Sequence, residues 1–180
     1  MEELGKRLTE SEAVRRYGLV RAGIADGVAV TFLDLDAEEI RVVAGGHSDP
    51  AVSLAMSIGY GQVARTCFRH APPTPGEIET AIAVVEDELM KYRFAIPRNS
   101  ALFATNNMLN RIAQAAGDEG NEILGVELVE ATFERLAAIV LGRPAAQDAI
   151  PTDAGFAAAL TILREFMHHF GFESVTILPA

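Results

Sequence analysis

The hydrophobic period of this 180-residue sequence changes at Gly59. Before Gly59, three apolar and β-branched runs lie at residues 28–33, 40–44 and 52–58, and turn-forming residues separate them. Such runs predict strands, and short connections between consecutive strands predict an antiparallel meander. After Gly59 the apolar residues recur with helical spacing. The chain therefore combines a meander with helices that cover it.

The helical pattern has clear starts and stops. We expect helices over residues 10–21, 60–69, from 75 onward, 106–116, 126–141 and 152–170, and further strands over 100–104 and 175–178. Thr9 and Thr74 are the expected N-caps of the first and third helices, and Pro75 suits a first helical position. The order predicts a single α/β domain, ribonuclease-H-like or actin-like, with helices on both faces of a mixed sheet.

Charge and composition narrow the possible functions. The chain has 15 Lys+Arg against 25 Asp+Glu, a formal charge of -10, which disfavours binding to nucleic acid or to a membrane surface. One cysteine, Cys67, excludes an internal disulfide, and its apolar surroundings favour a buried thiol over a nucleophile. The N-terminal residues do not form a signal peptide and no run is long enough to span a membrane. We expect a cytoplasmic protein.

Four carboxylates gather after the first strand. Asp34, Asp36, Glu38 and Glu39 lie within six positions at a strand-to-strand turn, where Asp34 with Asp36 or Glu39 could hold Mg²⁺ through water. The alternative is a solvated turn without a ligand. Neither of the usual glycine-rich phosphate motifs, GxxxxGK[ST] and GxGxxG, is present.

For several other polar residues, the sequence allows either a functional or a purely structural role. Thr105, Asn106 and Asn107 lie between an expected strand and helix, where they could bind an anion or simply cap the helix. Glu12, on the first helix, is either a general base in a cleft or a surface glutamate. His168 and His169 point about 100° apart on a helix, so we expect surface or helix-end positions rather than one shared metal.

These segments resemble the exopolyphosphatase and guanosine-pentaphosphate phosphohydrolase family of the actin-like ATPase superfamily. Thr9–Tyr17 is similar to the family's SGxEEAxL segment, with Glu12 on its second glutamate, and the strand ending in Asp34 is similar to the one entering its DIGGGSTE phosphate loop. Residues 57–59, 72–89 and 162–175 resemble its LG or MG pair, the helix after it, and its closing helix and strand. The resemblance implies the family's second actin-like domain, over residues 1–180, with a leading helix at 1–24, a meander at 25–59 and alternating elements at 60–180.

The departures from the family pattern fall on the phosphate loops. Leu35 to Arg41 replace the glycines, serine, threonine and glutamate of the first loop, and Ala104 to Asn107 replace the second loop. A Cβ blocks the close approach of backbone N–H groups to an anion, and the added acidic residues repel it. In the family the active site lies between two domains, and this chain begins near the end of the first one.

The resemblance implies two functions of different classes. In the first, the chain is a non-catalytic relative that binds a partner protein, as a homodimer or with a separate first domain, or a phosphorylated small ligand. In the second, it is a Mg²⁺-dependent phosphohydrolase acting on polyphosphate or a guanosine polyphosphate, with Glu12 as base, and a second chain completes the site.

Overall fold

The computed structural model describes residues 9–25, 27–118, 120 and 122–179. Its helices are α1 (Glu10–Ala22), α2 (Tyr60–Cys67), α3 (Pro75–Met90), α4 (Asn107–Ala115), α5 (Val126–Val140) and α6 (Ala154–Phe170), with a short 3₁₀ turn, η1 (Ala145–Gln147). Its strands are β1 (Val30–Leu35), β2 (Ile40–Gly45), β3 (Val52–Met56), β4 (Ala101–Thr105), β5 (Ile123–Gly125) and β6 (Ser174–Ile177).

The strands form one mixed sheet in the order β3-β2-β1-β4-β6-β5. β1, β2 and β3 pair antiparallel, which confirms the predicted meander. β4 pairs parallel with both β1 and β6, and β5 is antiparallel to β6. Parallel neighbours bring the carboxyl ends of β1, β4 and β6 to the same edge of the sheet.

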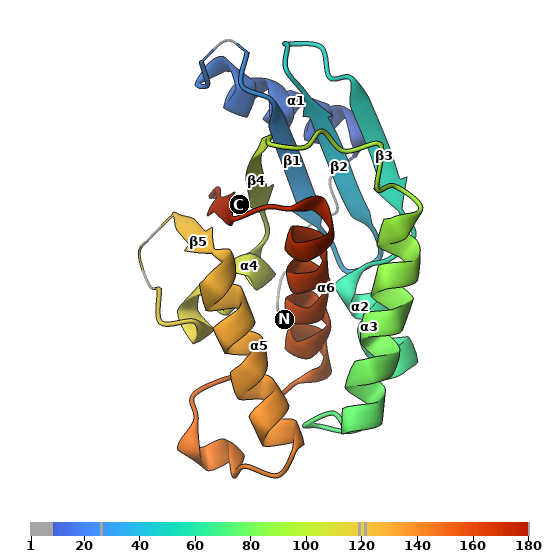
Figure 1. The fold of residues 1–180 in the computed structure, drawn as a ribbon, viewed down its shortest axis with the longest axis vertical. Helices are drawn as coiled ribbons and strands as arrows, with labels where there is room; N and C mark the ends of the chain where they lie inside the picture. Colours follow the sequence, from blue (N-terminus) through green and yellow to red (C-terminus); the bar gives the residue numbers. More distant parts are fainter. Residues whose placement is uncertain (1–8, 26, 119, 121, 180) are drawn as a thin grey trace.

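Helices cover both faces, as the sequence predicts. On one face, Ala13 and Tyr17 of α1 pack against Val30, Phe32 and Val43. The main core lies on the other face, where α6 runs between α3 and α5 (Figure 1). The helical spacing of the apolar residues after Gly59 is confirmed in α3, where Ile78, Val85 and Leu89 are buried in that core and Ile82 is partly buried against it.

Local sequence signals account for most of the helix ends. Thr9 and Glu12 form a capping box at α1, and Thr74 and Glu77 form another at α3, whose first residue is Pro75. Asp153 caps α6, and Gly171 ends it in the left-handed region at φ 73°. α6 therefore begins at Ala154 rather than at the predicted residue 152.

Three details differ from the sequence-based expectation. β1 runs two residues further than expected, so Asp34 lies in the strand and not in the turn. β5 was not expected, because its three residues continue directly into α5 and their apolar pattern merges with that of the helix. Residues 145–147, to which the sequence analysis assigned no element, form η1. Within the described residues, none of the helices combines the length and apolar character needed to cross a bilayer.

Candidate functional site at the carboxyl ends of β1 and β4

The two segments that the sequence marks as phosphate loops lie side by side. Asp34 of β1 is in register with Thr105 of β4, and each residue is 4% exposed. Both residues lie on the face of the sheet that packs against α1. Phe32, two positions before Asp34 on the same strand, is buried against that helix, and side chains two positions apart share a face. We call this region the loop edge; it comprises the carboxyl ends of β1 and β4, the β1–β2 turn, the first two turns of α2 and of α4, and Asp153, which pairs with Arg111.

α1 crosses one face of the sheet, and one of its side chains, Arg16, reaches the loop edge. Tyr17 Oη donates to the carbonyl of His47 at 2.6 Å, and Arg21 Nε donates to that of Gly46 at 3.1 Å. These bonds hold the later turns of α1 beside the end of β2, which lies opposite the start of β1. From the middle of the helix, Arg16 Nη1 donates to Thr105 Oγ1 at 3.0 Å. In the first turn of the helix, Glu10 accepts a hydrogen bond from Ser53 of β3 at 3.1 Å.

The carboxylate of Glu12 takes part in the helix cap. Its Oε2 accepts from the Thr9 backbone N–H at 2.8 Å and from Thr9 Oγ1 at 2.9 Å, while its own N–H donates to Thr9 Oγ1 at 3.3 Å. The spacing Thr9-x-x-Glu12 is a readable capping-box signal that the sequence interpretation did not use. The cap gives Glu12 a structural role, and its role as a general base stays a prediction.

Backbone N–H groups of the β1–β2 turn donate hydrogen bonds to acceptors within the turn itself. The Asp36 N–H donates to the Glu39 carbonyl, and the Glu38 N–H donates to Asp36 Oδ1, each at 3.1 Å. A phosphate loop would present such N–H groups to an anion.

The same turn also covers the start of α2. The carbonyls of Asp36 and Ala37 accept from the N–H groups of Tyr60 and Gln62, at 3.1 and 3.0 Å. A Cβ at Gly59 would lie 2.4 Å from the backbone of Ala37, so only glycine permits this approach. The N–H groups at this helix start, where anions commonly bind, face carbonyl oxygens instead.

Two of the four carboxylates of the turn are paired with arginines. Arg65 holds both oxygens of Glu38, at 3.0 and 2.9 Å, and Arg41 holds Glu39 at 2.5 Å. The carboxylates of Asp34, Asp36 and Glu39 do not form a close metal-ligating group among the described residues. The Mg²⁺ site proposed from them stays a prediction.

The second loop is built as a helix start. Asn106 Oδ1 accepts from the Met108 N–H at 2.8 Å, so Asn106 is the N-cap of α4, and Asn107 is the first helical residue. Thr105 lies at the end of β4 and accepts from Arg16. The structure therefore contains the cap that the sequence offered as the alternative to an anion site. Anion binding by these residues stays a prediction.

Two side chains of the loop edge were missed by the sequence interpretation. The pKa of Tyr60 is raised, first by burial and then by the negative charges of Asp36 and Asp34, while Arg111 opposes the rise. Arg111 also pairs with Asp153 at 2.8 Å. Tyr60 could have been noticed in the sequence, because it directly follows Gly59 at an expected helix start. Nothing in the local sequence around Arg111 indicates that it belongs to this site.

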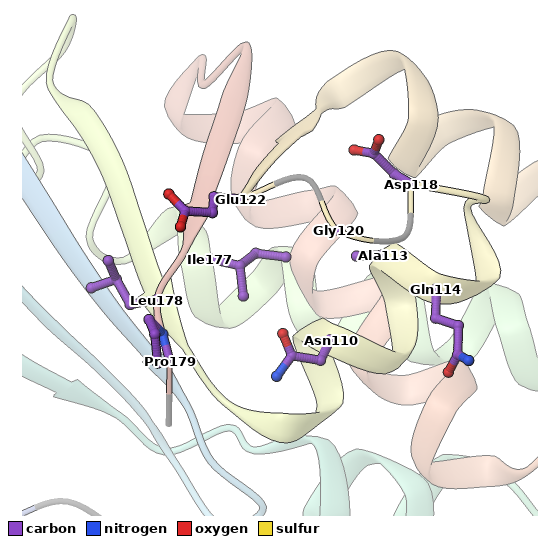
Figure 2. Close-up of a pocket in the computed structure, with 9 residues that line it drawn as sticks. All are labelled: Asn110, Ala113, Gln114, Asp118, Gly120, Glu122, Ile177, Leu178 and Pro179. Carbon is purple, nitrogen blue, oxygen red and sulfur yellow. The ribbon is translucent and has the colours of Figure 1, made fainter.

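A hollow of about 380 Å³ lies beside the loop edge, between α4 and the end of β6 (Figure 2). Asn110 and Gln114 line it from the helix, and Asp118 and Glu122 line it from the following connection. Its described lining contains two carboxylates and no Lys or Arg. Such a hollow repels phosphate groups and accepts hydrogen-bond donors.

Solved structures share the overall fold of this chain. An Aquifex aeolicus Ppx/GppA phosphatase matches with a TM-score of 0.75 at 16% identity, over 94% of this chain. An exopolyphosphatase from Cytophaga hutchinsonii matches with a TM-score of 0.71 at 10% identity, also over 94%. This chain has the Ppx/GppA domain fold. The actin-like fold class expected from the sequence is thereby confirmed.

The similarity to Ppx/GppA structures covers only part of those proteins. The chain spans 59% of the Aquifex aeolicus protein and 60% of the Cytophaga hutchinsonii one. An exopolyphosphatase-like protein matches with a TM-score of 0.61 at 14% identity, and the chain spans 63% of it. No protein-family model matches the sequence, and no curated protein matches it. At these identities, the Ppx/GppA similarity establishes the fold.

Proposed function

We propose that this chain is a non-catalytic relative of the Ppx/GppA domain and that it binds a partner protein through the loop edge. The carrying observation is the closed β1–β2 turn. Its amide groups at Asp36 and Glu38 bond within the turn, and the carbonyls of Asp36 and Ala37 face the start of α2. The position that the family resemblance assigns to a glycine-rich phosphate loop therefore offers acidic side chains in place of amide donors.

Charge favours a protein over a phosphorylated ligand at this edge. The chain carries a net charge of -10, and the neighbouring hollow has two carboxylates in its described lining. The loop edge also presents exposed ionic groups of both signs. The side chains of Arg65 and Glu38 are 61% and 55% exposed, and those of Arg111 and Asp153 are 43% and 52% exposed. A surface of this kind suits a partner with complementary charges.

A charge-reversal comparison tests the proposed surface. The tagged chain, Arg65→Glu and Arg98→Glu are each used to capture proteins from an extract of the source cells. Arg98 is exposed in the connection between α3 and β4, so its reversal is the matched control. We expect a protein that the wild type and Arg98→Glu both retain and Arg65→Glu loses. Equal retention by all three chains, or by none, contradicts binding at the loop edge.

Self-association is a separate form of the same proposal. Sedimentation of the wild type and of Arg65→Glu over a range of concentrations shows whether the partner is a second copy. A dimer that Arg65→Glu weakens identifies a homodimer through the loop edge. If the protein is strictly monomeric, the proposed partner is a different chain, such as a separate first domain.

The second candidate is a Mg²⁺-dependent phosphohydrolase. It is favoured by the placement of Asp34 beside Thr105, to which Arg16 of α1 donates a hydrogen bond. Glu12→Gln tests it selectively, because glutamine also serves in a capping box and so removes the charge while keeping the cap. In this candidate, Mg²⁺-dependent phosphate release requires Glu12. Calorimetry with pyrophosphate and guanosine tetraphosphate, with and without Mg²⁺, tests for a phosphorylated ligand without catalysis.

A further inference from the structure

A second cluster of ionisable groups lies away from the loop edge, between α3 and α6, which pack side by side (Figure 1). It consists of Glu86 on α3 with Glu165 and His169 on α6, whose ligand atoms all lie within 4.8 Å of one another. Among the described residues this is the group whose geometry allows three side chains to hold one metal ion. The loop edge shares none of these residues.

The imidazole of His169 faces both carboxylates. Its Nε2 lies 3.4 Å from Glu86 Oε1 and 3.5 Å from Glu165 Oε2. This nitrogen is buried and has no hydrogen-bond partner among the described residues. Glu165 and His169 are four residues apart on one helix, so they face the same side.

The distances fit the edges of a tetrahedral metal site. With metal–ligand bonds of about 2.0–2.1 Å, ligand atoms around a tetrahedral zinc ion lie about 3.3–3.4 Å apart. The two distances from Nε2 are close to this value and are longer than an ordinary hydrogen bond of about 2.7–3.2 Å. A mixture of imidazole nitrogen and carboxylate oxygen suits Zn²⁺ or a similar transition metal better than Mg²⁺ or Ca²⁺.

Neighbouring residues fix the buried ligand. Glu165 is 2% exposed, and its other oxygen accepts from Arg164 Nη1. Arg164 in turn donates through Nε to Glu130 on α5 at 2.8 Å. Such outer contacts orient a carboxylate ligand. Three glutamates and one arginine around a neutral imidazole leave two negative charges, which a divalent cation neutralises.

We propose that Glu86, Glu165 and His169 bind a zinc ion that joins α3 to α6, with a water molecule as the fourth ligand. Glu86 comes from a different helix and is the more exposed ligand, since its side chain is 45% exposed. Zinc binding thus links two helices that pack on opposite sides of the cluster. The site is independent of the function proposed for the loop edge.

Zinc titration of the chelator-treated protein tests this site. Calorimetry compares the wild type with His169→Gln, Glu86→Gln and His168→Gln. His168 is the exposed neighbour of His169 on the same helix, so it is the matched control. We expect His169→Gln and Glu86→Gln to weaken zinc binding at least about 10-fold, as loss of a ligand requires, and His168→Gln to leave it unchanged. Circular dichroism confirms that each variant is folded.

Cobalt(II) gives an independent readout. A tetrahedral cobalt(II) complex has intense visible absorption, which we expect for the wild type and for His168→Gln and not for His169→Gln. A wild-type chain that binds neither Zn²⁺ nor Co²⁺ overturns the proposal and leaves a histidine held between two carboxylates. Equal weakening by His168→Gln and His169→Gln also overturns it, because it indicates binding at the helix surface.

Discussion

Asp34 and Thr105 lie directly opposite each other on the parallel strands β1 and β4, and Arg16 of α1 donates a hydrogen bond to Thr105. The two segments that stand in place of the family's phosphate loops therefore meet, as the parallel register of the strands requires. What differs is their chemistry. The first loop is a closed acidic turn packed against Gly59, and the second is a helix start capped by Asn106.

Gly59→Ala should destabilise the protein by about 1–3 kcal/mol, because the added methyl group meets backbone atoms of Ala37 and Glu38 at 2.4–2.5 Å. Urea denaturation measures the loss. Gly76→Ala is the control, since a Cβ there meets nothing within 4 Å. If the two variants are equally stable, the turn does not pack against α2 as described.

Thr9→Ala should lower the free energy of unfolding by about 1 kcal/mol, because Thr9 caps α1 and exchanges hydrogen bonds with Glu12. Ser11→Ala removes an exposed hydroxyl from the first turn of the same helix and should have a smaller effect. Thermal denaturation of both variants checks the difference. Equal stability of Thr9→Ala and the wild type would falsify the capping role.

Glu77 should make a pH-dependent contribution to stability. Its pKa is lowered from 4.5 to about 2, mainly by the hydrogen bond from the Thr74 backbone, with further help from His70 and Arg69. A lowered pKa in the folded state stabilises the protein above the unfolded-state pKa, and this stabilisation is lost as the pH falls through the folded-state pKa. The wild type should therefore exceed Glu77→Gln in stability at neutral pH.

The difference should shrink as the pH falls from about 4.5 toward 2. Denaturation curves at several pH values in this window measure it. Glu79→Gln is the control. It makes the same change at an exposed position of α3 and so measures how replacing a glutamate by glutamine affects stability without the contacts of Glu77. A stability difference between the wild type and Glu77→Gln that is constant over the window contradicts the lowered pKa.

The parts of the fold that follow local rules were predictable from the sequence. The meander depends on alternation and turns, and the caps at Thr9 and Thr74 depend on spacings of three residues. Cys67 is buried, as its apolar surroundings predicted. β5 was missed because three apolar residues in front of a helix carry no separate signal.

The contacts that define the two sites depend on tertiary structure. No local pattern shows that the carbonyls of Asp36 and Ala37 meet the start of α2, more than twenty positions later. His168 and His169 lie in the last turn of α6, as expected, but His169 is partly buried because α3 packs beside it and brings Glu86 within 3.4 Å. The spacing of Glu165 and His169 was visible in the sequence, but their third neighbour was not.

Phosphate release is the most direct test of the central claim that the loop edge is non-catalytic. The wild type and Glu12→Gln are incubated with long-chain polyphosphate and with guanosine pentaphosphate, with and without Mg²⁺, and released phosphate is measured against a protein-free blank. The account predicts that neither chain releases phosphate above the blank. Mg²⁺-dependent release by the wild type that Glu12→Gln abolishes would contradict it and establish a phosphohydrolase with Glu12 as base.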